Sequence, residues 1–157
     1  MCSSDLQNEG KIQPGDVFMM NNPFNGGTHL PDVTVITPVF DDANERIIFT
    51  VASRGHHADI GGKTPGSAPP DSRHIEEEGV LIDNFLLVKK GSLQEAETRA
   101  LLGSGRYPCR NIDQNMADLA AQVAANAPGA QELGKPVRLF GLAGVPAYLR
   151  HVQEGGR

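Results

Sequence analysis

Two short segments of this chain combine histidine with aspartate. They are His29-Leu30-Pro31-Asp32 and His56-His57-Ala58-Asp59, and they hold three of the five histidines among the 157 residues. Imidazole nitrogens and carboxylate oxygens are ligands that zinc, manganese and iron accept in proteins. Two imidazoles and one carboxylate would also leave coordination positions open for water or a substrate. The two segments therefore predict a divalent transition-metal site, provided that the fold brings them together.

The first segment can supply two ligands only if its backbone bends. In a flat strand, residues three apart point to opposite faces and lie roughly 10 Å apart. Gly26, Gly27 and Pro31 are residue types that produce such a bend close to His29 and Asp32. Asp32 also has a purely structural alternative, in which its carboxylate caps the turn after Pro31.

The second segment contains adjacent histidines, of which one at most is expected to bind the ion directly. If the strand continues through His56 and His57, their side chains point to opposite faces. The other imidazole would then lie behind the ligands or belong to the core. Either histidine could instead be a hydrogen-bonded structural residue, so the spacing leaves both the metal and the structural interpretation open.

Two other kinds of catalytic motif are not supported. Gly61-Gly62-Lys63-Thr64 resembles the end of a phosphate-binding loop, but that motif requires a glycine five positions before Gly62, where this chain has His57. Pro65 follows directly, and no apolar helical period comes after it. We therefore expect no nucleotide at this loop. A serine nucleophile is not predicted either, because these serines lack a G-x-S-x-G context: Ser53, Ser67 and Ser72.

Apolar and β-branched runs predict the strands that position these segments. The runs cover residues 17–20, 32–40 and 46–53, and the polar residues 41–44 between the last two predict a hairpin turn. The run 46–53 is apolar at both odd and even positions, which predicts a central strand covered on both faces.

The predicted hairpin brings the two histidine segments together. His56 follows the end of the third run, and the neighbouring strand starts at Asp32, so an imidazole can meet the bend that carries the other ligands. Residues 61–72 are rich in glycine and proline and predict a long loop. Residues 80–82 and 85–88 then look extended.

The second half of the chain is predicted to be helical. Ser92-Leu93-Gln94-Glu95 has the capping-box pattern for a helix that ends near Leu102. Asn111 can cap a second helix, which is expected to end by Pro128-Gly129. One or two further amphipathic helices are expected after it, with interruptions at three positions: Pro136, Gly141 and Pro146.

These elements indicate an α+β fold with one hydrophobic core, which is what 157 residues can support. Residues 12–91 are expected to be β-rich with hairpin strands and to carry the metal loops, and residues 92–157 to be helical. Residues 1–11 are expected to be a non-native or disordered start, because Cys2-Ser3-Ser4-Asp5-Leu6 matches the translated end of a common sequencing adapter.

Composition excludes several classes of partner. The chain has 14 Lys and Arg residues against 19 Asp and Glu residues, a formal net charge of −5, which argues against binding to nucleic acid or to an anionic membrane. No run approaches the roughly 20 apolar residues of a spanning helix. The start lacks the apolar core of a signal peptide, so we expect a cytoplasmic location. The two cysteines, Cys2 and Cys109, lack the CxxC spacing of a zinc or redox site.

The glycine- and histidine-containing segments form one long combination of motifs. In chain order they are Gly15-Asp16-Val17-Phe18, Asn21-Asn22-Pro23-Phe24, Gly26-Gly27-Thr28-His29-Leu30-Pro31-Asp32-Val33, His56-His57-Ala58-Asp59-Ile60-Gly61-Gly62, Thr64-Pro65-Gly66-Ser67, Glu78-Gly79, Asp118-Leu119, Gln122-Val123-Ala124-Ala125-Asn126 and Gly129. Over roughly residues 12–150 this combination closely resembles the hydantoinase B/oxoprolinase family. That family includes the B-type subunit of N-methylhydantoinases and the C-terminal part of 5-oxoprolinases, and it is related to one subunit of acetone carboxylases.

The resemblance implies roles for particular residues. Related carboxylases hold their metal with a His-x-x-Asp pair and a second histidine, which match His29, Asp32 and His56 here. In those carboxylases a different residue follows the second histidine, so His57 is a feature of the hydantoinase side of the family. Asp59 or His57 would be the proton acceptor or the residue that orients it.

The resemblance also implies a reaction, namely the ATP-dependent opening of a cyclic amide such as 5-oxoproline or a hydantoin. An A-type partner subunit would use the ATP to phosphorylate the lactam oxygen, and water activated at the metal would attack the ring carbon. Because the family's subunit is much longer, this chain is expected to be a segment of a larger α+β subunit. Two alternatives stay open: a carboxylase subunit of the acetone-carboxylase type, and an inactive fragment that serves as an interaction module.

Overall fold

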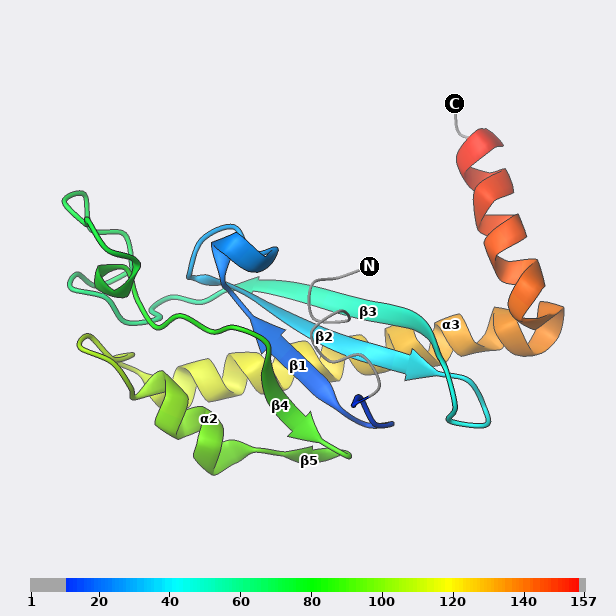
Figure 1. Ribbon diagram of the computed structural model, residues 1–157, viewed down its shortest axis with the longest axis horizontal. Helices are drawn as coiled ribbons and strands as arrows, with labels where there is room; N and C mark the ends of the chain where they lie inside the picture. Colours follow the sequence, from blue (N-terminus) through cyan, green and yellow to red (C-terminus); the bar gives the residue numbers. More distant parts are fainter. Residues whose placement is uncertain (1–10, 156–157) are drawn as a thin grey trace.

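The computed structural model describes residues 11–155, which form one antiparallel sheet with a long helix across one face (Figure 1). The sheet has five strands in the order β3-β2-β1-β4-β5. Their bounds are β1 Val17–Met20, β2 Asp32–Phe40, β3 Ile47–His56, β4 Phe85–Lys89 and β5 Ser92–Leu93. The helices are η1 Pro23–Asn25, η2 Ile75–Glu77, α2 Glu95–Leu102 and α3 Ile112–Gly155. The predicted α+β class is confirmed, and the expectation for residues 1–10 lies outside the described residues.

The predicted hairpin of β2 and β3 is confirmed, and it is longer than expected. β3 continues to His56, and the register places Asp32 directly opposite His56. At the other end, the Asp41 side chain closes the turn by accepting the backbone N–H of Glu45 at 2.8 Å. The hairpin therefore holds the start of β2 and the end of β3 side by side.

The prediction that this third strand is central is wrong, because β3 forms an edge of the sheet. From Phe49 to Gly55 its odd-numbered side chains are half-buried and its even-numbered ones are exposed. The half-buried side faces α3, where Val51 lies close enough to Gly129 that an added Cβ there would be 3.3 Å from Val51 Cγ1. Although the sequence of β3 is apolar on both faces, only the face toward α3 is covered.

The helix that ends at Leu102 is confirmed, but its predicted capping box is wrong. Ser92 belongs to β5, where it pairs with Lys89 across a tight turn, and Gln94 precedes the helix without a side-chain cap. Lys90 and Gly91 both have positive φ, at 50° and 82°, as the turn requires. Because Ser92 pairs with β4, it is not available to cap α2. Residues 80–82, predicted as extended, lie outside the strands.

The helix capped by Asn111 is also confirmed, since Asn111 Oδ1 accepts the backbone N–H of Gln114 at 3.2 Å. The predicted end at Pro128-Gly129 is wrong, because α3 continues to Gly155. Pro128 removes one helical hydrogen bond. The packing of α3 against β2 and β3 nevertheless keeps the residues around Pro128 helical. The one non-helical residue inside α3 is Gly141 (φ 73°, ψ 164°), and the orange-to-red end of the helix turns away from the sheet there (Figure 1).

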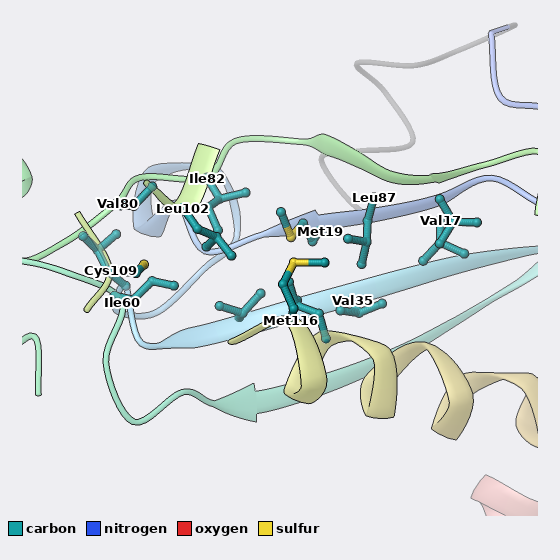
Figure 2. Packing of buried hydrophobic residues seen from close by; sticks show 14 residues of the cluster. Val17, Met19, Val35, Ile60, Val80, Ile82, Leu87, Leu102, Cys109 and Met116 are labelled. Atoms are coloured by element: carbon teal, nitrogen blue, oxygen red, sulfur yellow. The ribbon is translucent and has the colours of Figure 1, made fainter. Parts of the chain in front are cut away.

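The core lies between the sheet, α2 and the first half of α3 (Figure 2). Its largest fully buried side chains include Met19 of β1, Leu87 of β4 and Leu119 of α3. Burial of each such side chain contributes about 1.5–3 kcal/mol. The described part of the chain has no helix that is both long enough and apolar enough to cross a membrane.

Candidate metal centre

The fold brings His29, Asp32 and His56 together at the open end of the β2–β3 hairpin. One ligand atom from each of the three lies within 4.8 Å of the others. Asp32 is central, with Oδ2 3.2 Å from Nδ1 of His29 and Oδ1 2.9 Å from Nδ1 of His56. The two imidazole rings face each other at a centroid distance of 5.3 Å and an interplanar angle of 35°.

A glycine bend turns His29 back toward Asp32. Gly26 has a left-handed φ of 97°, which glycine adopts without strain. Gly27 packs so tightly that a Cβ would lie 2.4 Å from the carbonyl oxygen of Asn21. The turn is closed by the Asp32 N–H, which donates to the His29 carbonyl at 3.0 Å. The bend that the sequence required is therefore present.

Hydrogen bonds keep the Asp32 carboxylate charged. Burial alone would raise its pKa, but hydrogen bonds from His56 and from the Thr28 hydroxyl, at 3.0 Å for the latter, hold the pKa below its ordinary value. The side chains of His29 and His56 are 51% and 63% exposed. The three donors therefore present a charged carboxylate and two accessible imidazoles to solvent.

His57 points away from this cluster into the protein, and it is 2% exposed. Gln122 of α3 uses its Nε2 to donate to backbone carbonyls, so its Oε1 must accept from Nε2 of His57, at 3.1 Å. Nδ1 of His57 then accepts from Nδ2 of Asn115 at 3.0 Å. The expectation that the two histidines point to opposite faces is confirmed. Both nitrogens of His57 are occupied, which fits an orienting residue rather than an exposed proton acceptor.

The Asp59 carboxylate is surrounded by N–H donors. Oδ1 accepts from the backbone N–H of Gly61 at 2.9 Å and of Arg110 at 3.2 Å, while Oδ2 accepts from Arg110 Nη1 at 2.6 Å and from Gly66 N at 3.3 Å. Burial opposes ionisation, but these hydrogen bonds hold the pKa of Asp59 below its ordinary value. Asp59 therefore organises the loop that follows it.

Sequence reasoning missed Thr28, Asn115 and Arg110 as partners of the predicted residues, and it gave Gln122 no role beyond the family motif. One signal for the helical residues was available. Asn115, Gln122 and Asn126 share the helical stripe of the buried Leu119, at spacings of three, four and seven. Polar side chains on a buried stripe need partners. Nothing in the local sequence indicated Arg110.

Comparison with known proteins gives consistent results. A family model described as hydantoinase B/oxoprolinase matches residues 2–157. The 5-oxoprolinase of Saccharomyces cerevisiae is 48% identical over 151 residues, which cover 92% of this chain and 12% of the yeast protein. The chain thus spans about an eighth of that relative.

Two solved structures share the fold. The crystal structure of an ATP-dependent caprolactamase from Pseudomonas jessenii matches with a TM-score of 0.78 and 29% identity, over 91% of this chain and 24% of that one. A nucleotide-free acetone carboxylase matches with a TM-score of 0.73 and 20% identity, over 93% of this chain and 18% of that one. The resemblance inferred from the sequence motifs is confirmed.

Proposed function

Since the chain belongs to the hydantoinase B/oxoprolinase family, we propose that it carries the metal-binding, hydrolytic centre of an ATP-dependent cyclic amidase of the 5-oxoprolinase type. One observation carries the proposal: His29, Asp32 and His56 present ligand atoms within 4.8 Å of one another at an accessible strand end. Similarity to 5-oxoprolinases supports the choice of reaction.

The donor set fits a divalent transition metal. Two imidazole nitrogens and one carboxylate oxygen suit zinc, manganese or iron, and three protein ligands leave room for water and substrate. The anionic carboxylate is the form of Asp32 that binds a cation, and hydrogen bonds hold the pKa of this carboxyl below its ordinary value. A metal bound there would supply Lewis-acid activation of water.

His57 and Asp59 serve this centre as orienting residues. Adjacent in sequence to His56, His57 fixes the end of β3 to α3 through Gln122 and Asn115. Asp59 holds the next turn through Arg110. Neither needs to exchange a proton with substrate for these roles.

ATP is used by an A-type partner in this proposal, and the glycine loop of the present chain supports that division. The backbone N–H groups of Gly61, Gly62 and Lys63 already donate to Asp59 Oδ1, the Tyr107 carbonyl and the Glu77 carbonyl. A phosphate loop needs such amides free to surround the phosphate. The Lys63 ammonium is likewise engaged, 3.0 Å from Asp71 Oδ2.

The test uses the protein from the complete reading frame that contains this sequence, together with its A-type partner. Wild type should couple ATP hydrolysis to the opening of 5-oxoproline or hydantoin. Asp32→Asn should abolish ring opening while ATP hydrolysis by the partner continues, because a neutral amide is a poorer ligand than a carboxylate. Thr28→Val is the control: it replaces the hydroxyl that donates to Asp32 by a methyl group and leaves the carboxylate in place, so ring opening should continue.

Three results would overturn the proposal. A fully active Asp32→Asn complex would remove the metal centre from the reaction. A bicarbonate-dependent product in place of ring opening would indicate the carboxylase type. The absence of either activity in a folded, metal-loaded complex would indicate an interaction module.

A further inference from the structure

Gln122 lies on α3 behind the candidate metal centre, and its side-chain amide contacts β2, which carries Asp32, and β3, which carries His56. We propose that Gln122 is a positioning residue that fixes the separation of Asp32 and His56 and thereby sets the affinity of the centre for its metal. This inference rests on the proposed function, because it assumes that those residues bind an ion.

The amide nitrogen of Gln122 joins β2 to β3. Nε2 donates to the carbonyl of Val33 at 3.0 Å and to the carbonyl of Ser53 at 3.3 Å. Val33 directly follows Asp32, and Ser53 lies three residues before His56. A single planar group therefore holds the two backbones at the ligand-bearing end of the hairpin.

The amide oxygen of Gln122 links it, through His57, to the residue before Asp32. Oε1 accepts from Nε2 of His57, which directly follows His56. The backbone N–H of His57 in turn donates to the carbonyl of Pro31 at 2.8 Å, and Pro31 directly precedes Asp32. The residues on either side of Asp32 are thus linked to Gln122, one directly and the other through His57.

Gly55 allows this approach. It sits opposite Val33 in the register and one residue before His56. A Cβ at Gly55 would lie 3.0 Å from the Gln122 amide carbon and 3.1 Å from its Oε1. A side chain at residue 55 would therefore press on the Gln122 amide and require it to shift by a few tenths of an ångström.

Small displacements at such a position matter because metal ligands must be held close to their ideal distances, within about 0.2 Å. Loss of groups that support ligands from behind typically costs about 10–100-fold in metal affinity. Gln122 acts on the backbones next to two ligands at once, so its removal should fall in this range.

Asn126 provides a matched control on the same helix. Its Nδ2 donates to the carbonyl of Val35 at 3.2 Å and to the Thr37 hydroxyl at 3.1 Å, so it also fixes α3 to β2. It contacts the strand farther along, away from Asp32. Loss of Asn126 should therefore reduce stability without moving the ligands.

The experiment compares Gln122→Met with Asn126→Leu, which keep side-chain volume and remove the hydrogen bonds, in the protein from the complete reading frame. Zinc affinity is measured with a competing chromophoric chelator, and His56→Ala identifies the zinc that belongs to this site. The Co²⁺ absorption spectrum reports ligand geometry, and thermal unfolding is measured without metal.

We expect Gln122→Met to weaken zinc binding by about 10–100-fold and to change the Co²⁺ spectrum. Asn126→Leu should lower the Tm of the metal-free protein while leaving zinc affinity within about threefold of wild type. Gly55→Ala presses on the same amide from the strand and should shift zinc affinity in the same direction as Gln122→Met.

The outcomes separate the two proposals. If wild type holds no zinc that His56→Ala removes, the proposed metal centre is overturned and the role of Gln122 falls with it. If wild type binds zinc but Gln122→Met matches Asn126→Leu in affinity and spectrum, the positioning role alone is overturned. If Gln122→Met does not fold, zinc affinity and the Co²⁺ spectrum of Gly55→Ala decide, and values equal to wild type overturn the role.

Discussion

Asp32 and His56 lie directly opposite each other at the open end of the β2–β3 hairpin, with Oδ1 of the aspartate 2.9 Å from Nδ1 of the histidine. They are 24 residues apart in the sequence, and the pairing of β2 with β3 brings them side by side. The same pair can hold a metal or simply a hydrogen bond.

The first prediction concerns metal content. The protein should bind one divalent transition metal that depends on His29, Asp32 and His56, because their ligand atoms lie within 4.8 Å of one another. Elemental analysis after reconstitution should show that His29→Ala and Asp32→Asn each lose this metal. Unchanged metal content in both variants would place the ion elsewhere.

The adjacent histidines should behave differently when replaced. His56→Ala should lose more metal affinity than His57→Ala, because His56 is exposed beside Asp32 whereas His57 is buried on the opposite face. His57→Ala should instead lose more stability, since each buried polar group left unpaired on Asn115 or Gln122 costs about 1–3 kcal/mol. Zinc titration and denaturant unfolding measure the two effects. Equal losses of affinity would contradict the assignment.

Asp59 should make stability depend on acid. Burial opposes its ionisation, but hydrogen bonds from Gly61 and Arg110 lower its folded-state pKa. The stabilisation that ionised Asp59 gives to the folded state is therefore fully present above the unfolded-state pKa of about 3.9. This stabilisation is lost as the pH falls through the lower folded-state pKa. The stability difference between wild type and Asp59→Asn should shrink below about pH 4. Asp42→Asn, at an exposed aspartate, controls for the loss of one negative charge. If the stability difference between wild type and Asp59→Asn grew as the pH fell, the folded-state pKa of Asp59 would not be lowered.

The glycine loop should not bind nucleotide. The N–H groups of Gly61 and Gly62 are already donated to protein oxygens, and Lys63 pairs with Asp71 and Glu77. Calorimetry should detect no ATP binding to this chain, and Lys63→Ala should leave ATP hydrolysis by the complex unchanged. Nucleotide binding that Lys63→Ala abolishes would overturn the assignment of ATP to the partner.

Cys109 should react slowly with thiol reagents. Burial, together with the nearby charge of Asp59, raises the pKa of its thiol to about 12, so very little thiolate forms at neutral pH. In a Cys2→Ser background, a chromogenic disulfide should label Cys109 rapidly only after unfolding. Rapid labelling of the native protein would show that this part of the core is open.

Local sequence was sufficient where the determining interactions are local. Gly26, Gly27 and Pro31 favour a tight bend, so the approach of His29 to Asp32 could be predicted from these three residues. The β-branched runs and the turn between them predicted the hairpin, and with it the meeting of Asp32 and His56. The opposite directions of His56 and His57 followed from the period of a strand.

Tertiary structure decided what depends on partners far along the chain. β3 is an edge strand and Ser92 joins β5 because of which strands pair, and no local pattern distinguishes those pairings from the predicted ones. α3 continues past Pro128 because packing against β2 and β3 outweighs the lost hydrogen bond.

The site shows the same division. Gln122 lies 65 residues from His57, and Arg110 lies 51 residues from Asp59. A side-chain amide or guanidinium can form hydrogen bonds with many different partners. The residues next to it in the sequence therefore do not indicate which partner it binds. Only when α3 packs across the hairpin does Gln122 reach the backbone carbonyls of β2 and β3, and the ends of these strands that carry Asp32 and His56 are then fixed from behind.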